Sequence, residues 1–257
     1  MLNVRANRTL VSLLICAGAL LTHSRTHLAQ SSTYTTTFAL TENPISESGK
    51  WINGGAAGGN LWGNLWGNVR TTPGLAFGVS QPTKFGDPTA VLTGPWTADQ
   101  AAQATARISK APTGACCHEA EVRLRTTISS GRITGYEVYC SVMADNPYCH
   151  IASWGGPNGA WANLTDVSST YLRDGDVLRG TVTGTNPVVI TMYINGVKVS
   201  QVQDTGNFRF SDGRKYGPWL TGSPGIGFWN TRDSNWSNFG FSRFTGQNLG
   251  TGAPPRR

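Results

Sequence analysis

Two carboxylates alternate along one extended stretch of the chain and could carry out acid–base chemistry. In the run HEAEVRLRTTIS, residues 118–129, Glu119 and Glu121 stand two positions apart, followed at the same spacing by Arg123 and Arg125. Residues two apart on a β-strand share a face, so the two carboxylates would stand about 6–7 Å apart. This range touches the spacing of the acid pair that cleaves glycosidic bonds with retention. The alternative is a solvated strand face whose alternating charges form cross-strand pairs.

Two turn-forming stretches carry oxygen ligands that could hold a calcium ion. Asp145 lies in the sequence ADN, and Asp174 and Asp176 flank the glycine of DGD. Carboxylate and carbonyl oxygens are the ligands that calcium takes in proteins. Because Asp, Asn and Gly also form ordinary turns, we expect no cofactor and keep calcium as the alternative.

Nine tryptophans give the chain a large aromatic content. An exposed Trp or Tyr packs against sugar rings while its polar edge bonds hydroxyl groups. The stretch GGNLWGNLWGNV repeats Asn-Leu-Trp-Gly around Trp62 and Trp66, and we expect a glycine-rich loop with Trp62 partly exposed. Trp161 lies in a loop beside a strand. With Tyr136 and Arg123, these three tryptophans are the predicted ligand-binding residues.

The N-terminus has the pattern of a secretion signal. Two arginines precede an apolar run, residues 10–21, which is too short to span a bilayer. Cleavage after Ser24 or Ala29 would remove a signal peptide within residues 1–29. Because no second run of adequate length follows, we expect an exported protein without a membrane span, extracellular or periplasmic.

The distribution of charge argues against nucleic acid as a partner. The formal net charge is +7, but only 14% of the residues are charged, and the lysines and arginines are scattered. A protein that tracks a phosphate backbone carries its basic residues in a stripe or patch. The sequence contains no such stripe.

Four cysteines beyond the signal segment predict disulfides in an exported protein: Cys116, Cys117, Cys140 and Cys149. A bond between the neighbours Cys116 and Cys117 is strained and rare, which favours pairing each of them with Cys140 or Cys149. However, Cys140 and Cys149 flank the turn ADNP and could face each other across a hairpin, so both connectivities stay open. Zinc is the rival interpretation, although the spacing lacks a Cys-x-x-Cys pair.

Short strands must position all of these residues. Extended runs recur at 8–12-residue spacing with Gly and Pro between them, which is typical of a β-sandwich or jelly roll. Asn195-Gly196 between two β-rich arms predicts a type I′ hairpin turn. Trp154, Phe228 and Trp229 fall in strand patterns and are expected in the core or half-buried. We predict a single all-β domain over 34–246, followed by a flexible tail over 247–257.

The order of motifs along the chain carries a family resemblance. YEVYCSV, YCHIASWGG, WANL, LRDGDVLRGTVTG, ITMYINGVKVSQVQD and GSPGIGF follow one another. This order resembles the laminin-G-like members of the concanavalin A-like lectin/glucanase superfamily, among them small secreted bacterial proteins. The resemblance covers roughly 38–244 and implies a concanavalin A-like jelly-roll β-sandwich. The stretch that follows Trp66, Asn68-Val69 and then RTTPG, also resembles this group and implies that Trp66 is packed.

The resemblance implies several functions, because this fold hosts lectins, glycoside hydrolases, polysaccharide lyases and adhesion modules. Laminarinase-type enzymes of the superfamily carry Glu-x-Asp-x-Glu on one strand, whereas this chain has Glu119, Glu121 and then Arg123. Members of the superfamily often bind calcium at a rim. We therefore expect a non-catalytic module that binds a polysaccharide, glycan or other extracellular partner on its concave sheet and rim loops. The alternatives are a hydrolase or lyase that uses Glu119 and Glu121, and a structural or adhesive surface protein.

Overall fold

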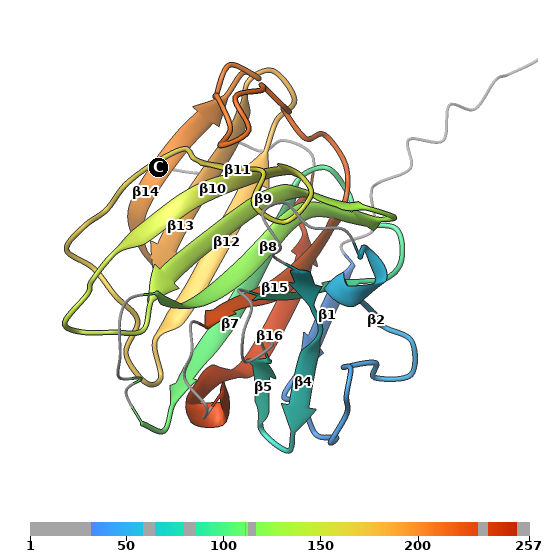
Figure 1. Ribbon diagram of the computed structural model, residues 1–257, viewed down its shortest axis with the longest axis vertical. Helices are drawn as coiled ribbons and strands as arrows, with labels where there is room; N and C mark the ends of the chain where they lie inside the picture. Colours follow the sequence, from blue (N-terminus) through green and yellow to red (C-terminus); the bar gives the residue numbers. More distant parts are fainter. Residues whose placement is uncertain are drawn as a thin grey trace, which may run out of the picture.

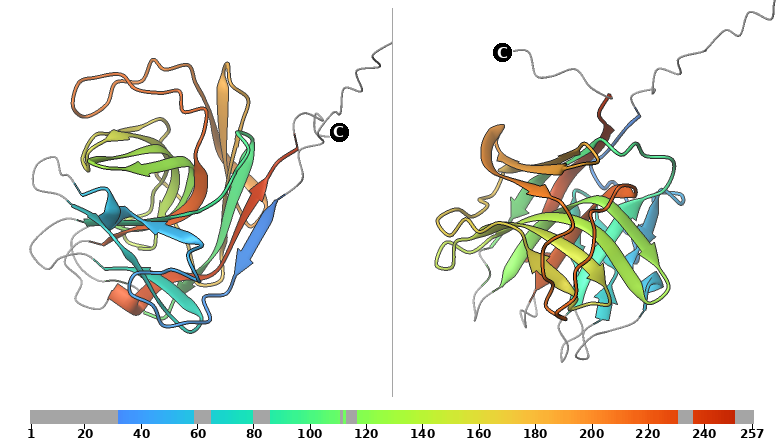
Figure 2. Two further views of the ribbon diagram at one scale, coloured as in Figure 1. Left: turned by 90° about the vertical axis from the view of Figure 1, so that its right-hand side faces the viewer. Right: turned by 90° about the horizontal axis from the view of Figure 1, so that it is seen from above.

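The computed structural model describes residues 32–58, 65–79, 86–110, 112, 117–230 and 236–250. In this part of the chain two eight-stranded sheets pack face to face (Figures 1 and 2). The first sheet runs in the order β14 (Val197–Asp204), β13 (Val188–Ile194), β12 (Val177–Thr183), β7 (Gln100–Ile108), β16 (Phe239–Asn248), β5 (Leu75–Gly78) and β4 (Val69–Thr72), with β1 (Thr33–Thr36) also paired to β16.

The second sheet carries the candidate site. It runs in the order β11 (Trp161–Asn163), β10 (Cys149–Gly156), β9 (Arg132–Ser141), β8 (His118–Ser129), β15 (Ser223–Asn230), β6 (Gly86–Leu92) and β2 (Trp51–Asn53), with β3 (Leu65–Gly67) also paired to β6. The described pairings are antiparallel except for the parallel pair β3–β6. Two short 3-10 turns, η1 (Gly54–Ala56) and η2 (Trp236–Asn238), are the only helical elements of the described residues. The predicted all-β jelly-roll sandwich is confirmed.

Alternation along each strand builds the core between the sheets. On β8, Ala120, Val122 and Leu124 point inward and have no exposed area. On β15, Ile226 and Phe228 do the same, and the Phe228 ring centroid lies 5.3 Å from that of Phe241 on β16. The residues between them therefore face outward, away from the first sheet.

The predicted type I′ turn closes the hairpin β13–β14. Ile194 pairs with Val197, which leaves a two-residue loop, and φ is +52° at Asn195 and +78° at Gly196. Positive φ at both loop residues is the signature of this turn, and Asn and Gly tolerate it best.

The charged face of β8 departs from the sequence expectation in two ways. Glu121 and Arg123 have no exposed area, so the solvated face considered above is wrong for them. The register between β8 and β9 shifts between Leu124 and Thr127, where Arg125 has φ of +45°. This irregularity breaks the alternation, and the Arg125 guanidinium donates to the carbonyl oxygens of Ala98, Trp219 and Gly184 instead of joining the other charges.

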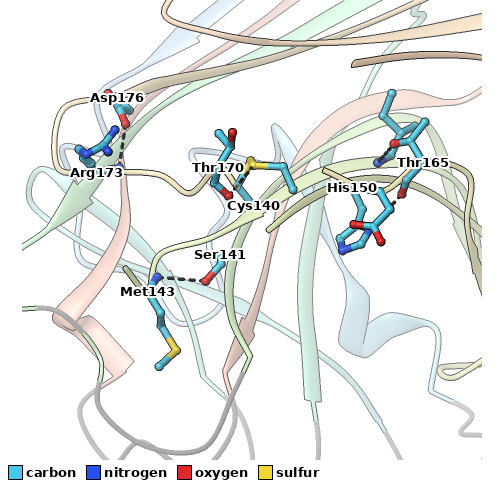
Figure 3. The surroundings of a disulfide bond; sticks show 11 residues. Cys140, Ser141, Met143, His150, Thr165, Thr170, Arg173 and Asp176 are labelled. Atoms are coloured by element: carbon cyan, nitrogen blue, oxygen red, sulfur yellow. Dashed lines mark hydrogen bonds and ion pairs between the residues drawn. A yellow bond between two sulfur atoms is a disulfide. The ribbon is translucent and has the colours of Figure 1, made fainter. Parts of the chain in front are cut away.

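One disulfide joins the facing ends of β9 and β10, between Cys140 and Cys149. Of the two open connectivities, the structure therefore has the bond across the hairpin. The Cys149 sulfur lies 3.5 Å from the Thr170 carbonyl oxygen, and the Met143 N–H donates to the Ser141 hydroxyl in the connecting turn (Figure 3). Cys117 is also disulfide-bonded, whereas Cys116 lies outside the described residues.

The ends of the sandwich lie near the predicted boundaries. Strand β1 begins at Thr33, and β16 continues to Asn248, two residues beyond the predicted end of the domain at 246. The predicted signal peptide, residues 1–29, and residues 251–257 of the predicted tail lie outside the described residues. Among the residues that are described, no helix is long and apolar enough to cross a membrane.

Replacing both Cys140 and Cys149 by alanine is expected to lower the free energy of unfolding by about 2–3 kcal/mol. The bond closes a short loop, and losing it restores conformational entropy to the unfolded chain. Urea denaturation of the wild type and the double variant measures the difference. A change below about 0.5 kcal/mol would show that the hairpin needs no covalent closure.

Candidate functional site: a carboxylate-rich aromatic pocket

The outward face of the second sheet carries a cavity of about 240 Å³, here called the outer-face pocket. Strands β6, β8, β9, β10, β11 and β15 all contribute to it. Its lining residues are Asp87, Cys117, Glu119, Glu137, Tyr139, Ala152, Trp154, Trp161 and Trp229. Aromatic rings and carboxyl groups thus share one small cavity.

The aromatic wall extends from the interior to the rim. Trp66 and Trp154 are buried, with their ring centroids 4.7 Å apart in an edge-to-face arrangement. The Trp161 ring lies 6.5 Å from that of Trp154 and is 37% exposed. The predicted packing of Trp66 is therefore confirmed, and Trp161 presents an accessible indole at the rim.

A buried guanidinium lies beneath the pocket. Arg123 on β8 forms ion pairs with Asp87 on β6, with Glu121 on its own strand at 2.5 Å and with Glu137 on β9 at 2.6 Å. Its Cζ also lies 5.6 Å from the ring centroid of Trp154, within the range of a cation–π contact. We call Asp87, Glu121, Arg123 and Glu137 the charged floor.

A glycine on β15 makes room for the charged floor. Gly227 lies opposite Glu121 on one side and Thr89 of β6 on the other. A Cβ atom at Gly227 would stand 2.2 Å from Glu121 Oε2 and 2.7 Å from Arg123 Nε. The side chains of β8 therefore reach Asp87 across β15 only because residue 227 has no side chain.

Glu119 is the carboxyl of β8 that faces the pocket. Tyr148 donates its hydroxyl to Glu119 Oε1 at 2.5 Å. The Tyr148 ring meets that of Tyr139 edge-to-face and that of His150 at a tilt, with centroid distances of 6.3 and 5.4 Å. The predicted pair of Glu119 and Glu121 shares a face, but only Glu119 lines the cavity. Glu121 lies in the floor, where it accepts from Arg123.

Burial raises the pKa of the pocket carboxyls. It raises the pKa of Glu119 to about 8, with a further contribution from the charges of Glu137 and Asp87, against the hydrogen bond from Tyr148. Burial also raises the pKa of Glu137 to about 7, although Arg123 lowers it. The pKa of Glu121 is raised by burial and by the neighbouring carboxylates. Glu119 therefore holds a proton near neutral pH and can donate a hydrogen bond.

A metal ion does not fit the charged floor. Ligand atoms of Asp87, Glu121 and Glu137 lie within 4.8 Å of one another, the one such group among the described residues. However, all three carboxylates already contact the Arg123 guanidinium, which supplies the positive charge that a cation would bring.

The three residues predicted as calcium ligands lie in two separate connections between strands. Asp174 pairs with Arg107 at 3.2 Å and accepts from the backbone N–H of Ile108. Asp176 accepts from the Arg173 N–H and from the Asn195 amide. Asp145 is exposed in the turn between β9 and β10. None of the three belongs to the metal-ligating group found in the described chain.

The structure separates the predicted ligand-binding residues. Trp161 lines the outer-face pocket, and Arg123 lies beneath it without exposed area. Tyr136 alternates to the inward face of β9, where its hydroxyl donates to Asp204 at 2.7 Å, so it belongs to the core and not to a binding surface. Trp62 lies outside the described residues.

Sequence reasoning missed several residues of the pocket. Glu137 and Tyr139 alternate on β9 directly opposite Arg123 and Glu121, a register set by the two-residue turn together with the irregularity between Leu124 and Thr127. The alternation in GYEVYC was a readable signal, but the irregularity that brings Glu137 opposite Arg123 was not. Asp87 had none, because it reaches Arg123 from a strand 36 residues earlier in the chain.

Comparison with known proteins finds weak similarity to solved structures only. No protein-family model matches the chain, and no curated protein matches its sequence. The chain is similar to β-agarase A in complex with oligoagarose, with 14% identity and a TM-score of 0.49 over 85% of this chain and 94% of that one. It is similar to the carbohydrate-binding module CBM66 from Bacillus subtilis, with 13% identity and a TM-score of 0.45 over 79% and 95%. It is also similar to the metal-free Emp46p carbohydrate recognition domain, with 12% identity and a TM-score of 0.48 over 83% and 95%.

At such low identities and TM-scores, the likeness concerns the fold alone. The function has to be argued from the residues of the outer-face pocket.

Gly227→Ala is expected to lower the free energy of unfolding by at least about 2 kcal/mol. The added methyl group would displace Glu121 and Arg123 and leave buried charges without partners. Gly250→Ala is the matched control, because a Cβ there meets no atom within 4 Å. Urea denaturation compares the two variants, and equal stabilities would contradict the close packing at Gly227.

The free energy of unfolding is expected to fall as the pH rises from about 4.5 to about 8. Glu119 and Glu137 have pKa values raised to about 8 and about 7 in the folded state, so the folded protein binds protons that the unfolded chain releases. Glu119→Gln should reduce this fall, since glutamine mimics the protonated carboxyl. Urea titrations at pH 5 and pH 8.5 measure it, with the exposed Asp145→Asn as control. A pH dependence unchanged in Glu119→Gln would contradict the raised pKa.

Proposed function

We propose that this protein is a non-catalytic carbohydrate-binding module that holds a sugar ring in the outer-face pocket. The observation that carries the proposal is the joint lining of one cavity by tryptophan rings and carboxyl groups. Aromatic faces pack against the C–H surface of a pyranose, and carboxyl oxygens bond its hydroxyl groups. The cavity lies below the ~300–1,000 Å³ of sites for drug-sized ligands, so it suits one ring or the end of a chain.

The pocket is prepared for a ligand before binding. Trp154 donates its indole N–H to Glu137, and its ring lies over the Arg123 guanidinium. Tyr139 donates to Asn163 at 2.9 Å. Side chains held in this way lose little conformational entropy when a sugar binds, which favours affinity.

Export of the protein is part of the proposal. The N-terminal pattern predicts a secretion signal, and the Cys140–Cys149 bond suits an oxidising compartment. An exported module of this kind would meet polysaccharides or cell-surface glycans as its partners.

Trp161→Ala is expected to weaken binding of a sugar ligand about tenfold, the equivalent of about 1.4 kcal/mol. The variant removes the accessible indole at the rim and leaves the buried charges untouched. Titration calorimetry with a ligand selected on a glycan array measures the effect. Val197→Ala, which removes an exposed side chain at the tip of the β13–β14 hairpin, is the control. An affinity unchanged by Trp161→Ala would place binding elsewhere.

Glycoside hydrolysis is the second candidate, and Glu119 is the observation in its favour. A carboxyl that lines a pocket and has a pKa of about 8 can act as a general acid. Binding ranks first because Glu121, the partner acid expected from the sequence, lies beneath the cavity with Arg123.

Incubating the protein with the ligand separates the two candidates. A binding module returns the oligosaccharide intact, and Glu119→Gln keeps at least part of its affinity. Release of reducing ends by the wild type, abolished in Glu119→Gln, would establish hydrolysis and overturn the non-catalytic proposal.

A further inference from the structure

The ionisable side chains that line the outer-face pocket are acids, with no basic group among those described. Asp87, Glu119 and Glu137 line it, and no lysine, arginine or histidine is among the lining residues that the structure describes. Tyr139 adds a phenol whose pKa burial raises well above its ordinary value, so it stays neutral. The cavity therefore offers acid groups and no fixed cation to a ligand.

The charged floor beneath the pocket does not supply a spare positive charge to a ligand. Arg123 is the one cation there, and it is already shared among three carboxylates. Glu121 Oε1 is buried and accepts no hydrogen bond from the described residues. With Glu119 above, four carboxyl groups surround a single guanidinium, so the site has spare capacity to accept hydrogen bonds and positive charge.

The aromatic wall also suits a cation. Trp66 and Trp154 already lie within 5.8 and 5.6 Å of Arg123 Cζ, so this wall stabilises a delocalised cation on its inner side. Trp161 extends the same wall to the rim, where its ring is accessible. Aromatic rings with adjacent carboxylates form the type of cage that recognises ammonium groups.

We infer that the outer-face pocket selects sugars that carry a free ammonium group and rejects sugars that carry carboxylate or sulfate. This inference rests on the proposed carbohydrate-binding function and names its ligand class. An ammonium on the ring would lie between the indole wall and Glu119, while the ring hydroxyls bond the remaining carboxyl oxygens. A uronate or sulfated sugar would find no cation in the described cavity lining to pair with, and an unpaired charge in a site of low dielectric is costly.

Three oligosaccharides of equal length test the inference by calorimetry at pH 6.5: glucosamine, N-acetylglucosamine and galacturonic acid oligomers. The glucosamine oligomer is expected to bind about tenfold more tightly than its N-acetylated form, and the galacturonate oligomer should bind most weakly.

A proton should leave the protein when the ammonium binds, because Glu119 ionises beside it. The charged and titratable groups that face Glu119 are Tyr148, Tyr139, Glu137, Asp87, Glu121 and Arg123. Buffers of different ionisation enthalpy report this release.

Glu119→Gln localises the preference to the pocket. The variant should reduce the ratio of the two affinities to about threefold or less, with little change for the N-acetylated oligomer, and Asp145→Asn should leave the ratio unchanged. Equal binding of both oligomers, tightest binding of the galacturonate, or a ratio unaffected by Glu119→Gln would overturn the inference while carbohydrate binding stands. No binding of any oligosaccharide on a full glycan array would instead refute the proposed function.

Discussion

The contact of Arg123 with three buried carboxylates is the constraint on which the second sheet depends. Removing an ion from water costs several kcal/mol even after relaxation, and only close pairing offsets that cost. The partners of Arg123 come from β6, β8 and β9. These strands must therefore keep one register, because a slip of one residue would turn every charged side chain into the apolar core. The requirement extends to β15, which passes between β6 and β8 and presents glycine where the charges cross it.

The pocket takes its shape and charge from the same contact. Glu137 accepts from the Trp154 indole while it pairs with Arg123, so one carboxylate fixes both an aromatic wall and the floor. With the floor carboxylates committed to the guanidinium, Glu119 is the carboxyl that bonds a tyrosine beside the cavity. Its burial near other acids raises its pKa and makes it a hydrogen-bond donor near neutral pH. Binding chemistry at the surface thus depends on a structural ion cluster below it.

Sequence patterns predicted the features that local chemistry controls. The sandwich architecture and the Asn195-Gly196 turn follow from short-range alternation and turn preferences, and the structure confirms them. The packing of Trp66, which the family resemblance implied, is also confirmed. The site was predicted only in part, because its members meet through tertiary register. Asp87 and Glu137 come from separate strands, and Tyr136 points into the core. The irregularity at Arg125 also removes that residue from the outward face expected for the alternating charges of β8. Trp154 was expected in the core or half-buried, and it is buried, although it faces the pocket on the outward side of its sheet.

The arginine at position 123 bears directly on the choice between binding and hydrolysis. A row of acids on one strand can supply both a general acid and a nucleophile, provided that both reach the substrate. Here Arg123 follows Glu119 and Glu121 on the same face of β8 and pairs with Glu121. Glu119 is therefore the residue of β8 that lines the cavity. A hydrolase would need its second carboxyl from Glu137 or Asp87, and both are held by the same guanidinium. A nucleophile held by a buried ion pair would have to break that pair to attack, whereas a hydrogen-bond acceptor for a sugar hydroxyl can remain in place. The geometry therefore favours recognition over catalysis.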